Sequence, residues 1–64
     1  HELLSDREYS VLVLIGQGKT PTEIAEQLIL SVKTVSTYRT RVLEKLNLQS
    51  TAELIRYVIE NNLV

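Results

Sequence analysis

The side chains best suited to chemistry lie in residues 31 to 46, SVKTVSTYRTRVLEKL. If this stretch is a helix, steps of about 100° per residue divide it into two unlike faces. Val35, Val42 and Leu46 fall on an apolar face. The opposite face holds Lys33, Thr37, Thr40 and Glu44, flanked by Ser36 and Arg41. Short hydroxyl side chains bordered by long basic ones suit recognition of a polar, negatively charged surface.

The major groove of DNA is such a surface, because its base edges present donors, acceptors and thymine methyl groups. We predict that Ser36, Thr37 and Thr40 contact base edges and that Lys33 reaches a guanine edge or a phosphate. Contacts to phosphates position a protein without reading sequence. We assign such contacts to Thr34, Tyr38, Arg39, Arg41 and Lys45. For Tyr38 the alternative is packing of its ring at the border of the core.

The distribution of charge supports this interpretation better than the net charge of −1 does. Residues 31 to 46 carry four basic side chains and one acid, whereas the remainder carries three basic side chains and seven acids. Local positive charge on an acidic body is typical of a small binding module. The alternative is an ordinary solvated helix face, and charge alone does not decide between the two.

Four helix starts are visible around this stretch. Ser5 to Glu8, Thr20 to Glu23 and Ser50 to Glu53 have the spacing of a capping box, and Ser31 is a simpler N-cap. Gly18 and Asn47 suit the left-handed residue that ends a helix. These signals predict helices over roughly 6–17, 21–28, 32–46 and 51–61.

No stretch has the two-residue alternation of a strand, so we predict an all-α fold with one four-helix domain over residues 1–64. The expected core positions combine the apolar stripes of the four helices. They are Tyr9, Leu12, Val13, the side of the first helix at Ile15, Ile24, Ala25, Leu28, Val35, Val42, Leu46, Ala52, Ile55, Val58 and Ile59. We expect Ile29, Leu30 and Leu48 to fill the corners between helices.

The last helix is apolar beyond its core stripe. Such a surplus can mark a partner surface, and we assign Leu54, Tyr57 and Val58 to a dimer interface. The alternative is that the rotation of this helix is misassigned and that these side chains belong to the core.

The second and third helices are separated only by residues 29 to 31, so they must cross steeply. This is the layout of a helix-turn-helix, whose second helix enters the major groove. The N-terminus of the helix over 21–28 presents backbone N–H groups and the hydroxyls of Thr20 and Thr22 beside Lys19. Such an end suits a phosphate, although Thr20 also caps the helix.

Residues 4 to 64 resemble the LuxR/FixJ-type (GerE-like) DNA-binding domain. The resemblance is carried by Leu4-Ser5-Asp6-Arg7-Glu8, Val11-Leu12, Gly18, Glu23-Ile24-Ala25, Leu30-Ser31, Lys33-Thr34-Val35-Ser36-Thr37, Lys45-Leu46 and Leu48. Two positions depart from the usual pattern, since Tyr38 stands where a His is common and Thr22 where a Lys is common.

This resemblance implies a cytoplasmic bacterial transcription regulator that binds double-stranded DNA as a homodimer through its last helix, with RNA polymerase as a further candidate partner. It implies base contacts from Ser36, Thr37 and Thr40. It also implies phosphate contacts from Thr20, Lys33, Tyr38 and Lys45. It suggests an upstream receiver domain, as in response regulators of two-component systems, or a small-ligand domain. Because the chain begins with His1 rather than Met, we expect a fragment of a longer protein.

Other function classes find little support. The chain has no cysteine, its one histidine is terminal, and no Gly-rich phosphate loop follows a strand, so we expect no enzyme, metal or cofactor. The longest apolar run, Val11 to Ile15, is far shorter than the ~20 residues that span a bilayer, so we expect no membrane partner. The remaining alternative is a helical interaction or dimerisation module that does not bind DNA.

Overall fold

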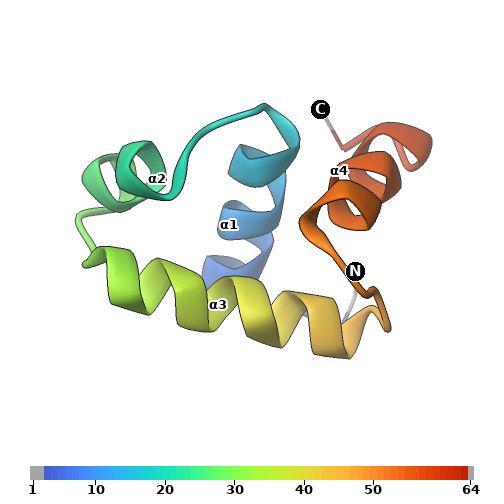
Figure 1. Cartoon of the computed structure of the whole chain (residues 1–64), viewed down its shortest axis with the longest axis horizontal. Helices are drawn as coiled ribbons and strands as arrows, with labels where there is room; N and C mark the ends of the chain where they lie inside the picture. Colours follow the sequence, from blue (N-terminus) through green and yellow to red (C-terminus); the bar gives the residue numbers. More distant parts are fainter. Residues whose placement is uncertain (1–2, 64) are drawn as a thin grey trace.

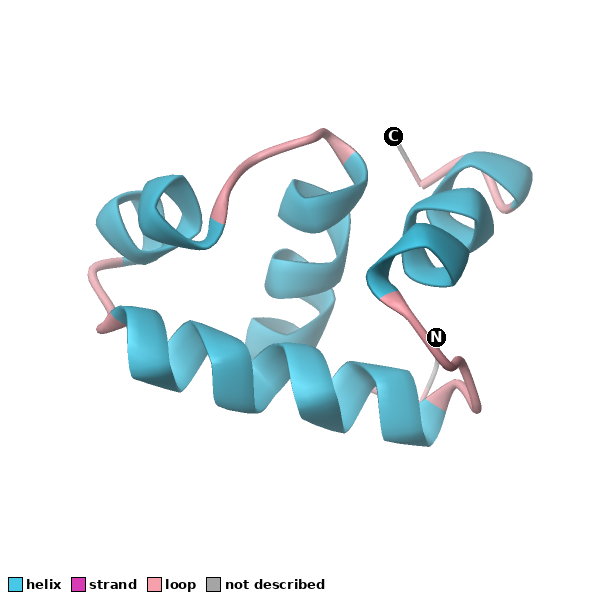
Figure 2. Ribbon diagram, viewed as in Figure 1, coloured by secondary structure: helices cyan, strands magenta, loops and turns pink. Residues whose placement is uncertain are grey.

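The structure is a computed structural model, and it describes residues 3–63. Its helices are α1 (Asp6–Gly16), α2 (Pro21–Leu28), α3 (Val32–Lys45) and α4 (Thr51–Glu60), and the described residues contain no strand (Figure 2). The predicted all-α fold is confirmed, and the predicted helix ends are correct to within one residue. Within residues 3–63, no helix is long and apolar enough to cross a membrane.

The first two capping boxes form as their spacing predicts. Ser5 Oγ accepts a hydrogen bond from the N–H of Glu8 at 3.2 Å, and the Glu8 carboxylate accepts one from the N–H of Ser5 at 2.8 Å. Thr20 and Glu23 make the same pair of bonds at 3.2 and 2.8 Å. Each box satisfies two backbone donors that a helix end would otherwise leave free.

The box at the start of α4 forms only in part. Ser50 Oγ accepts from the N–H of Glu53 at 3.2 Å, but the Glu53 carboxylate accepts from the N–H of Gln49 at 2.7 Å instead of that of Ser50. The φ angle of Ser50 is −154°, whereas it is −70° at Ser5. This more extended backbone accompanies the change of partner.

Helix α1 lies at the centre of the domain, where it contacts α2, α3 and α4 (Figure 1). Its buried residues Val11, Leu12, Leu14 and Ile15 therefore meet apolar side chains from every other helix. The rest of the core is Ile24, Ala25, Val35, Val42, Leu54 and Val58. The core positions predicted for α1 are partly wrong, because Tyr9 is exposed and Val13 only half-buried while Val11 and Leu14 are buried.

The predicted rotation of α4 is only partly right, because Val58 is a core residue as predicted but Ala52 and Ile59 are not. Leu54 and Val58 have no exposed surface, so they are core residues and cannot form the dimer interface assigned to them. Ala52 and Ile59, which were assigned to the core, are exposed instead. Both stripes are apolar, and only packing against α1 decides which one turns inward.

The corner between α2 and α3 contains a residue in an unusual conformation. Ile29 ends α2 with φ 57° and ψ 53°, in the left-handed region that β-branched residues rarely adopt. The N–H of the next residue, Leu30, donates to the carbonyl of Ala25 at 2.8 Å, which closes the helix end. As a result Leu30 turns partly into the core, as predicted, while Ile29 is 90% exposed rather than filling the corner.

Candidate nucleic-acid interface

Helix α3 lies along one edge of the domain, with the other three helices on one side of it (Figure 1). Its buried residues Val35 and Val42 hold that side against the core. At its start, Ser31 Oγ accepts from the N–H of Thr34 at 3.1 Å and lies 2.8 Å from the Thr34 hydroxyl oxygen. The Thr34 hydroxyl, predicted to bind phosphate, is therefore already part of the N-cap.

The predicted base-reading residues share one exposed face of α3. Lys33, Thr37 and Thr40 are exposed, and Ser36 is half-buried beside them. The Thr37 hydroxyl donates to the carbonyl of Lys33 at 3.2 Å, and the Thr40 hydroxyl donates to the carbonyl of Ser36 at 3.1 Å. Because each hydroxyl proton points back to the helix, the oxygens offer acceptor lone pairs outward. In this geometry the two threonines suit base amino groups and thymine methyl groups.

Tyr38 and Arg41 lie together at the border of this face. The Tyr38 ring is half-buried and packs against the core, and the guanidinium carbon of Arg41 lies 5.9 Å from the ring centroid. A cation over an aromatic face is attracted by the ring quadrupole. The Tyr38 ring thus has its alternative, packing role, and it holds an exposed arginine beside the face of Lys33, Thr37 and Thr40.

Arg39 lies on a different side of α3. It is half-buried, and its Nη1 donates to the hydroxyl oxygen of Thr51, the first residue of α4, at 3.5 Å. The side chain thus spans the gap between α3 and α4. Sequence reasoning missed Thr51 as its partner, since nothing in the spacing of the two residues indicates the contact.

Lys45 also lies away from the face of Lys33, Thr37 and Thr40. Its Nζ forms an ion pair with Oε1 of Glu8 at 2.7 Å and donates to the carbonyl of Leu3 at 3.4 Å. Hydrogen bonds from Lys45 and from the backbone of Ser5 lower the pKa of Glu8 from 4.5 to about 2. Glu8 therefore stays ionised and balances the charge of Lys45, which weakens the attraction of Lys45 for a phosphate.

The N-terminus of α2 carries Thr20 and Thr22, both exposed. The N–H of Thr20 donates to the carboxylate of Glu23, and this hydrogen bond lowers the pKa of Glu23. Pro21 has no N–H, and the N–H of Glu23 is bonded to the Thr20 hydroxyl. In the first turn of α2, the capping box therefore leaves the N–H of Thr22 available to an anion. A phosphate here would meet the negative charge of Glu23 as well.

The structure therefore brings together Lys33, Ser36, Thr37 and Thr40, with Arg41 at their border. Arg39 and Lys45 lie to the sides and are engaged with Thr51 and Glu8. Thr20 and Thr22 form a separate site at the start of α2.

The model for "Bacterial regulatory proteins, luxR family" matches residues 2–58 of the chain. The chain belongs to this family. The predicted family resemblance is thereby confirmed, and membership in a family of regulatory proteins gives no support to an enzyme.

Curated relatives agree with this assignment. The chain is 52% identical over 61 residues to "Virulence factors putative positive transcription regulator BvgA" of Bordetella pertussis, covering 95% of this chain and 29% of that protein. It is 45% identical over 62 residues to "Oxygen regulatory protein NreC" of Staphylococcus carnosus, covering 97% and 29%. It is 42% identical over 64 residues to "Transcriptional regulatory protein LiaR" of Bacillus subtilis, covering 100% and 30%. The chain thus spans less than a third of the length of these relatives.

Proposed function

We propose that this LuxR-family chain binds double-stranded DNA in a sequence-dependent manner, with α3 in the major groove, as the DNA-binding part of a bacterial transcription regulator. The observation that carries the proposal is the exposed face formed by Lys33, Thr37 and Thr40 on a helix whose opposite side is buried. Such a helix can enter a groove without disturbing the core. In this role the threonine oxygens read base edges, while Lys33 contacts a guanine or a phosphate.

Phosphate contacts hold the domain in register on the duplex. Arg41 is the strongest candidate, because it is exposed and positioned by the Tyr38 ring. The N–H of Thr22 and the hydroxyl of Thr20 offer a second contact at the start of α2. Arg39 and Lys45 contribute positive potential, although each already has a partner within the domain.

We further propose that the chain pairs on DNA through α4, by a different face from the one first predicted. Ala52 and Ile59 are exposed and Ile55 is half-buried, and their spacing places them on one stripe. Tyr57 is half-buried and lies on another side of the helix. A stripe of this kind suits a two-fold contact in which the same surface serves both copies.

Three further predictions rest on the family resemblance alone. They are regulation of transcription in the bacterial cytoplasm, contact with RNA polymerase and control by an upstream receiver domain. They concern proteins as long as the relatives described above, of which this chain spans less than a third.

A salt series tests DNA binding directly. Fluorescence anisotropy with labelled duplexes should give an affinity that falls steeply with salt, by a slope of about −0.9 for each phosphate contact. Arg41→Gln should shallow this slope by about one. Arg56→Gln, an exposed arginine of α4, is the control and should leave the slope unchanged. Absence of binding to any duplex at low salt would favour the interaction module without DNA.

Base reading has its own test. Thr40→Val keeps the shape of the side chain but removes the oxygen, so selection from a random duplex pool should return a changed preference. Each lost base contact should cost about 1–3 kcal/mol at the affected position. Equal weakening on all sequences would remove Thr40 from the reading residues.

A further inference from the structure

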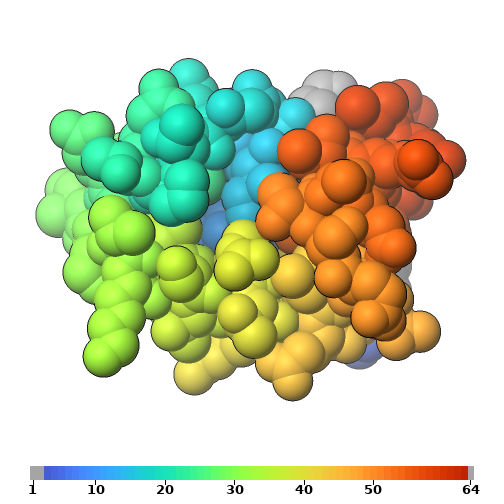
Figure 3. All heavy atoms as spheres, in the orientation of Figure 1, coloured from blue at the N-terminus to red at the C-terminus, as the bar shows by residue number. Residues whose placement is uncertain are grey.

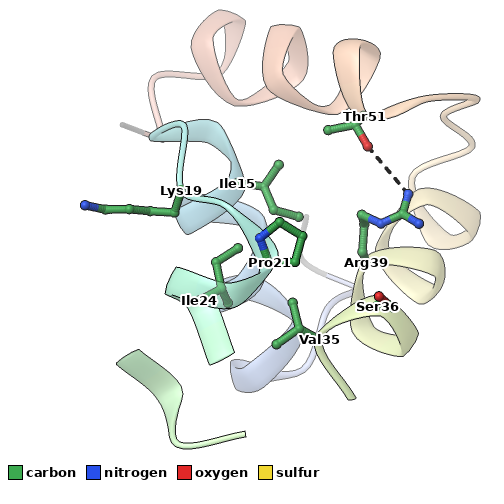
Figure 4. Close-up of a pocket in the computed structure, with 8 residues that line it drawn as sticks. All are labelled: Ile15, Lys19, Pro21, Ile24, Val35, Ser36, Arg39 and Thr51. Atoms are coloured by element: carbon green, nitrogen blue, oxygen red, sulfur yellow. Dashed lines mark hydrogen bonds between the residues drawn. The ribbon is translucent and has the colours of Figure 1, made fainter. Parts of the chain in front are cut away.

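A pocket of about 460 Å³ opens between α2, α3 and the start of α4. In the space-filling view this face is hollowed, and atoms of α1 are visible between the surrounding helices (Figure 3). Ile15, Ile24 and Val35 come from three helices to give the pocket an apolar lining (Figure 4). Its size lies in the range of small-molecule sites, roughly 300–1,000 Å³.

The pocket also has polar lining residues. Ser36, Arg39 and Thr51 are among them, and none of the described residues that line the pocket is acidic. Figure 4 shows the Arg39 guanidinium directed towards Thr51 across the pocket edge, whereas the ammonium of Lys19 is turned away from it. Arg39 is therefore the cation that a bound molecule would meet, and Lys19 contributes only its stem.

Arg39 retains hydrogen-bonding capacity. A guanidinium has five N–H donors, and among the described residues only the Thr51 hydroxyl accepts one of them, at the long distance of 3.5 Å. A carboxylate matches the fork of a guanidinium with two parallel hydrogen bonds. The half-buried position of Arg39 strengthens such a contact, because solvent screens it less than it screens an exposed arginine.

We propose that this pocket binds a small organic anion, namely a carboxylate attached to a flat or branched apolar body. The apolar body lies against Pro21, above the buried side chains of Ile15, Ile24 and Val35. The carboxylate is held by Arg39, with the hydroxyls of Thr51 and Ser36 beside it. The absence of acidic groups among the described lining residues and the Arg39 guanidinium at the pocket edge favour an anion over a cation or a neutral molecule.

Occupation of the pocket opposes DNA binding, and this part rests on the function proposed above. Ser36 is a proposed base-reading residue, and Arg39 contributes to the potential that attracts phosphates. A ligand that engages both side chains withdraws them from DNA. Because coupling between two ligands is reciprocal, DNA also lowers the affinity for the anion by the same factor.

The first experiment uses the chain alone, with 1-naphthoate as the probe and the uncharged 1-naphthamide as its matched control. Amide NMR spectra should show shifts at Ile15, Ile24 and Val35 on titration with naphthoate, with a dissociation constant of roughly 1 mM. Naphthamide should bind at least about tenfold more weakly, because it lacks the charge-assisted hydrogen bonds. Equal affinity of the two probes, or shifts confined to other surfaces, overturns the proposal.

A pair of variants locates the anion. Arg39→Gln should abolish the preference for naphthoate over naphthamide, whereas Lys19→Gln should change it by less than about twofold, since an exposed and distant charge is screened. Circular dichroism checks that Arg39→Gln remains folded, and if it unfolds, Thr51→Val serves as the second variant and should weaken naphthoate binding selectively. An unchanged preference in the folded variant overturns the assignment to Arg39.

The coupling is measured last, by anisotropy with a labelled duplex. Saturating naphthoate should weaken DNA binding several-fold in the unaltered chain, and naphthamide at the same concentration should not. A pocket occupied by naphthoate, as judged by NMR, with no change in DNA affinity contradicts the coupling. If the chain binds no DNA at all, the proposed function fails, while the NMR experiment still decides whether the pocket takes an anion.

Discussion

The Nζ atom of Lys45 lies 2.7 Å from Oε1 of Glu8, although the two residues are 37 positions apart in the chain. The same carboxylate oxygen accepts from the N–H of Ser5 at 2.8 Å. Glu8 is only 3% exposed, so the capping group of α1 is also the buried counter-charge for the last residue of α3. One side chain thereby fixes the end of α3 to the start of the central helix α1.

Glu8→Gln should destabilise the domain at neutral pH and reduce its loss of stability in acid. The pKa of Glu8 is lowered from 4.5 to about 2 in the folded chain, so its stabilising contribution is fully present above about pH 4.5 and is lost as the pH falls towards 2. Urea unfolding at a series of pH values measures this. The variant should show a lower midpoint at pH 7 and a shallower decline between these two values.

The control is Glu26→Gln, at an exposed position of α2. It should leave the decline of the free energy of unfolding in acid unchanged. Some decline should remain in Glu8→Gln, because the pKa of Glu23 is also lowered by its bonds to Thr20. If Glu8→Gln and the unaltered chain lose stability equally as the pH falls, the Glu8–Lys45 pair does not persist in solution.

Gly16 lies where α1 packs closely against Val58 of α4. A Cβ atom there would lie 2.8 Å from Cβ of Val58 and closer still to one of its methyl groups. Gly16→Ala should therefore lower the free energy of unfolding by about 1–3 kcal/mol, as overpacking of a core does, despite the better helix propensity of Ala, worth about 1 kcal/mol.

A double-mutant cycle identifies the cause. Val58→Ala alone removes buried methyl groups and should cost about 2 kcal/mol. Combined with Gly16→Ala, it makes room for the added methyl, so the two losses should be less than additive by at least about 0.5 kcal/mol. Strict additivity would mean that Val58 does not restrict position 16.

Ile29 is the residue whose replacement should stabilise the domain. A left-handed backbone costs a non-glycine residue roughly 1–2 kcal/mol, and Asn tolerates it better. The Ile29 side chain is 90% exposed, so little packing is lost. Ile29→Asn should raise the free energy of unfolding by about 0.5–1 kcal/mol, measured by urea denaturation.

The control is Ile59→Asn, which replaces an exposed isoleucine within the regular part of α4. Asn is a poorer helix former than Ile, so this variant should be neutral or slightly destabilising. Equal effects of the two substitutions would indicate that exposure, and not backbone strain, determines the result at Ile29.

The helices were predictable because their starts are local. The capping residues at Ser5, Thr20 and Ser31 act within one turn, and their spacing is visible in the chain. The left-handed end of α2 was missed because Ile29 is not a residue that signals it, and only the closure of the helix end by Leu30 imposes that conformation.

The site was predictable to the extent that one helix face defines it. Lys33, Thr37 and Thr40 share the exposed face expected from a 100° step. The partners of Arg39 and Lys45 were not predictable, because Thr51 and Glu8 reach them only through the packing of distant segments. The rotation of α4 was predicted only in part for the same reason, since two apolar stripes compete and only contact with α1 selects Leu54 together with Val58 for the core.

With Leu54 and Val58 in the core, the stripe of α4 that stays exposed is available for pairing on DNA. Ile59 is 60% exposed on the stripe with Ala52 and Ile55, whereas Leu54 is fully buried. Burying an isoleucine is worth about 1.5–3 kcal/mol, so Ile59→Ser should weaken binding to a duplex with two half-sites by at least about tenfold. Binding to a single half-site and the free energy of unfolding should change little, and Ser adds no negative charge that would repel DNA.

Two comparisons separate an interface residue from a structural one. Leu54→Ala should lower the free energy of unfolding by about 2–5 kcal/mol and weaken both duplexes alike through loss of folded protein. Glu60→Gln, exposed on α4 away from the stripe, should affect neither. If Ile59→Ser weakens single and paired half-sites by the same factor, the exposed stripe is not the pairing surface, and a dimer contact has to be sought elsewhere on the domain.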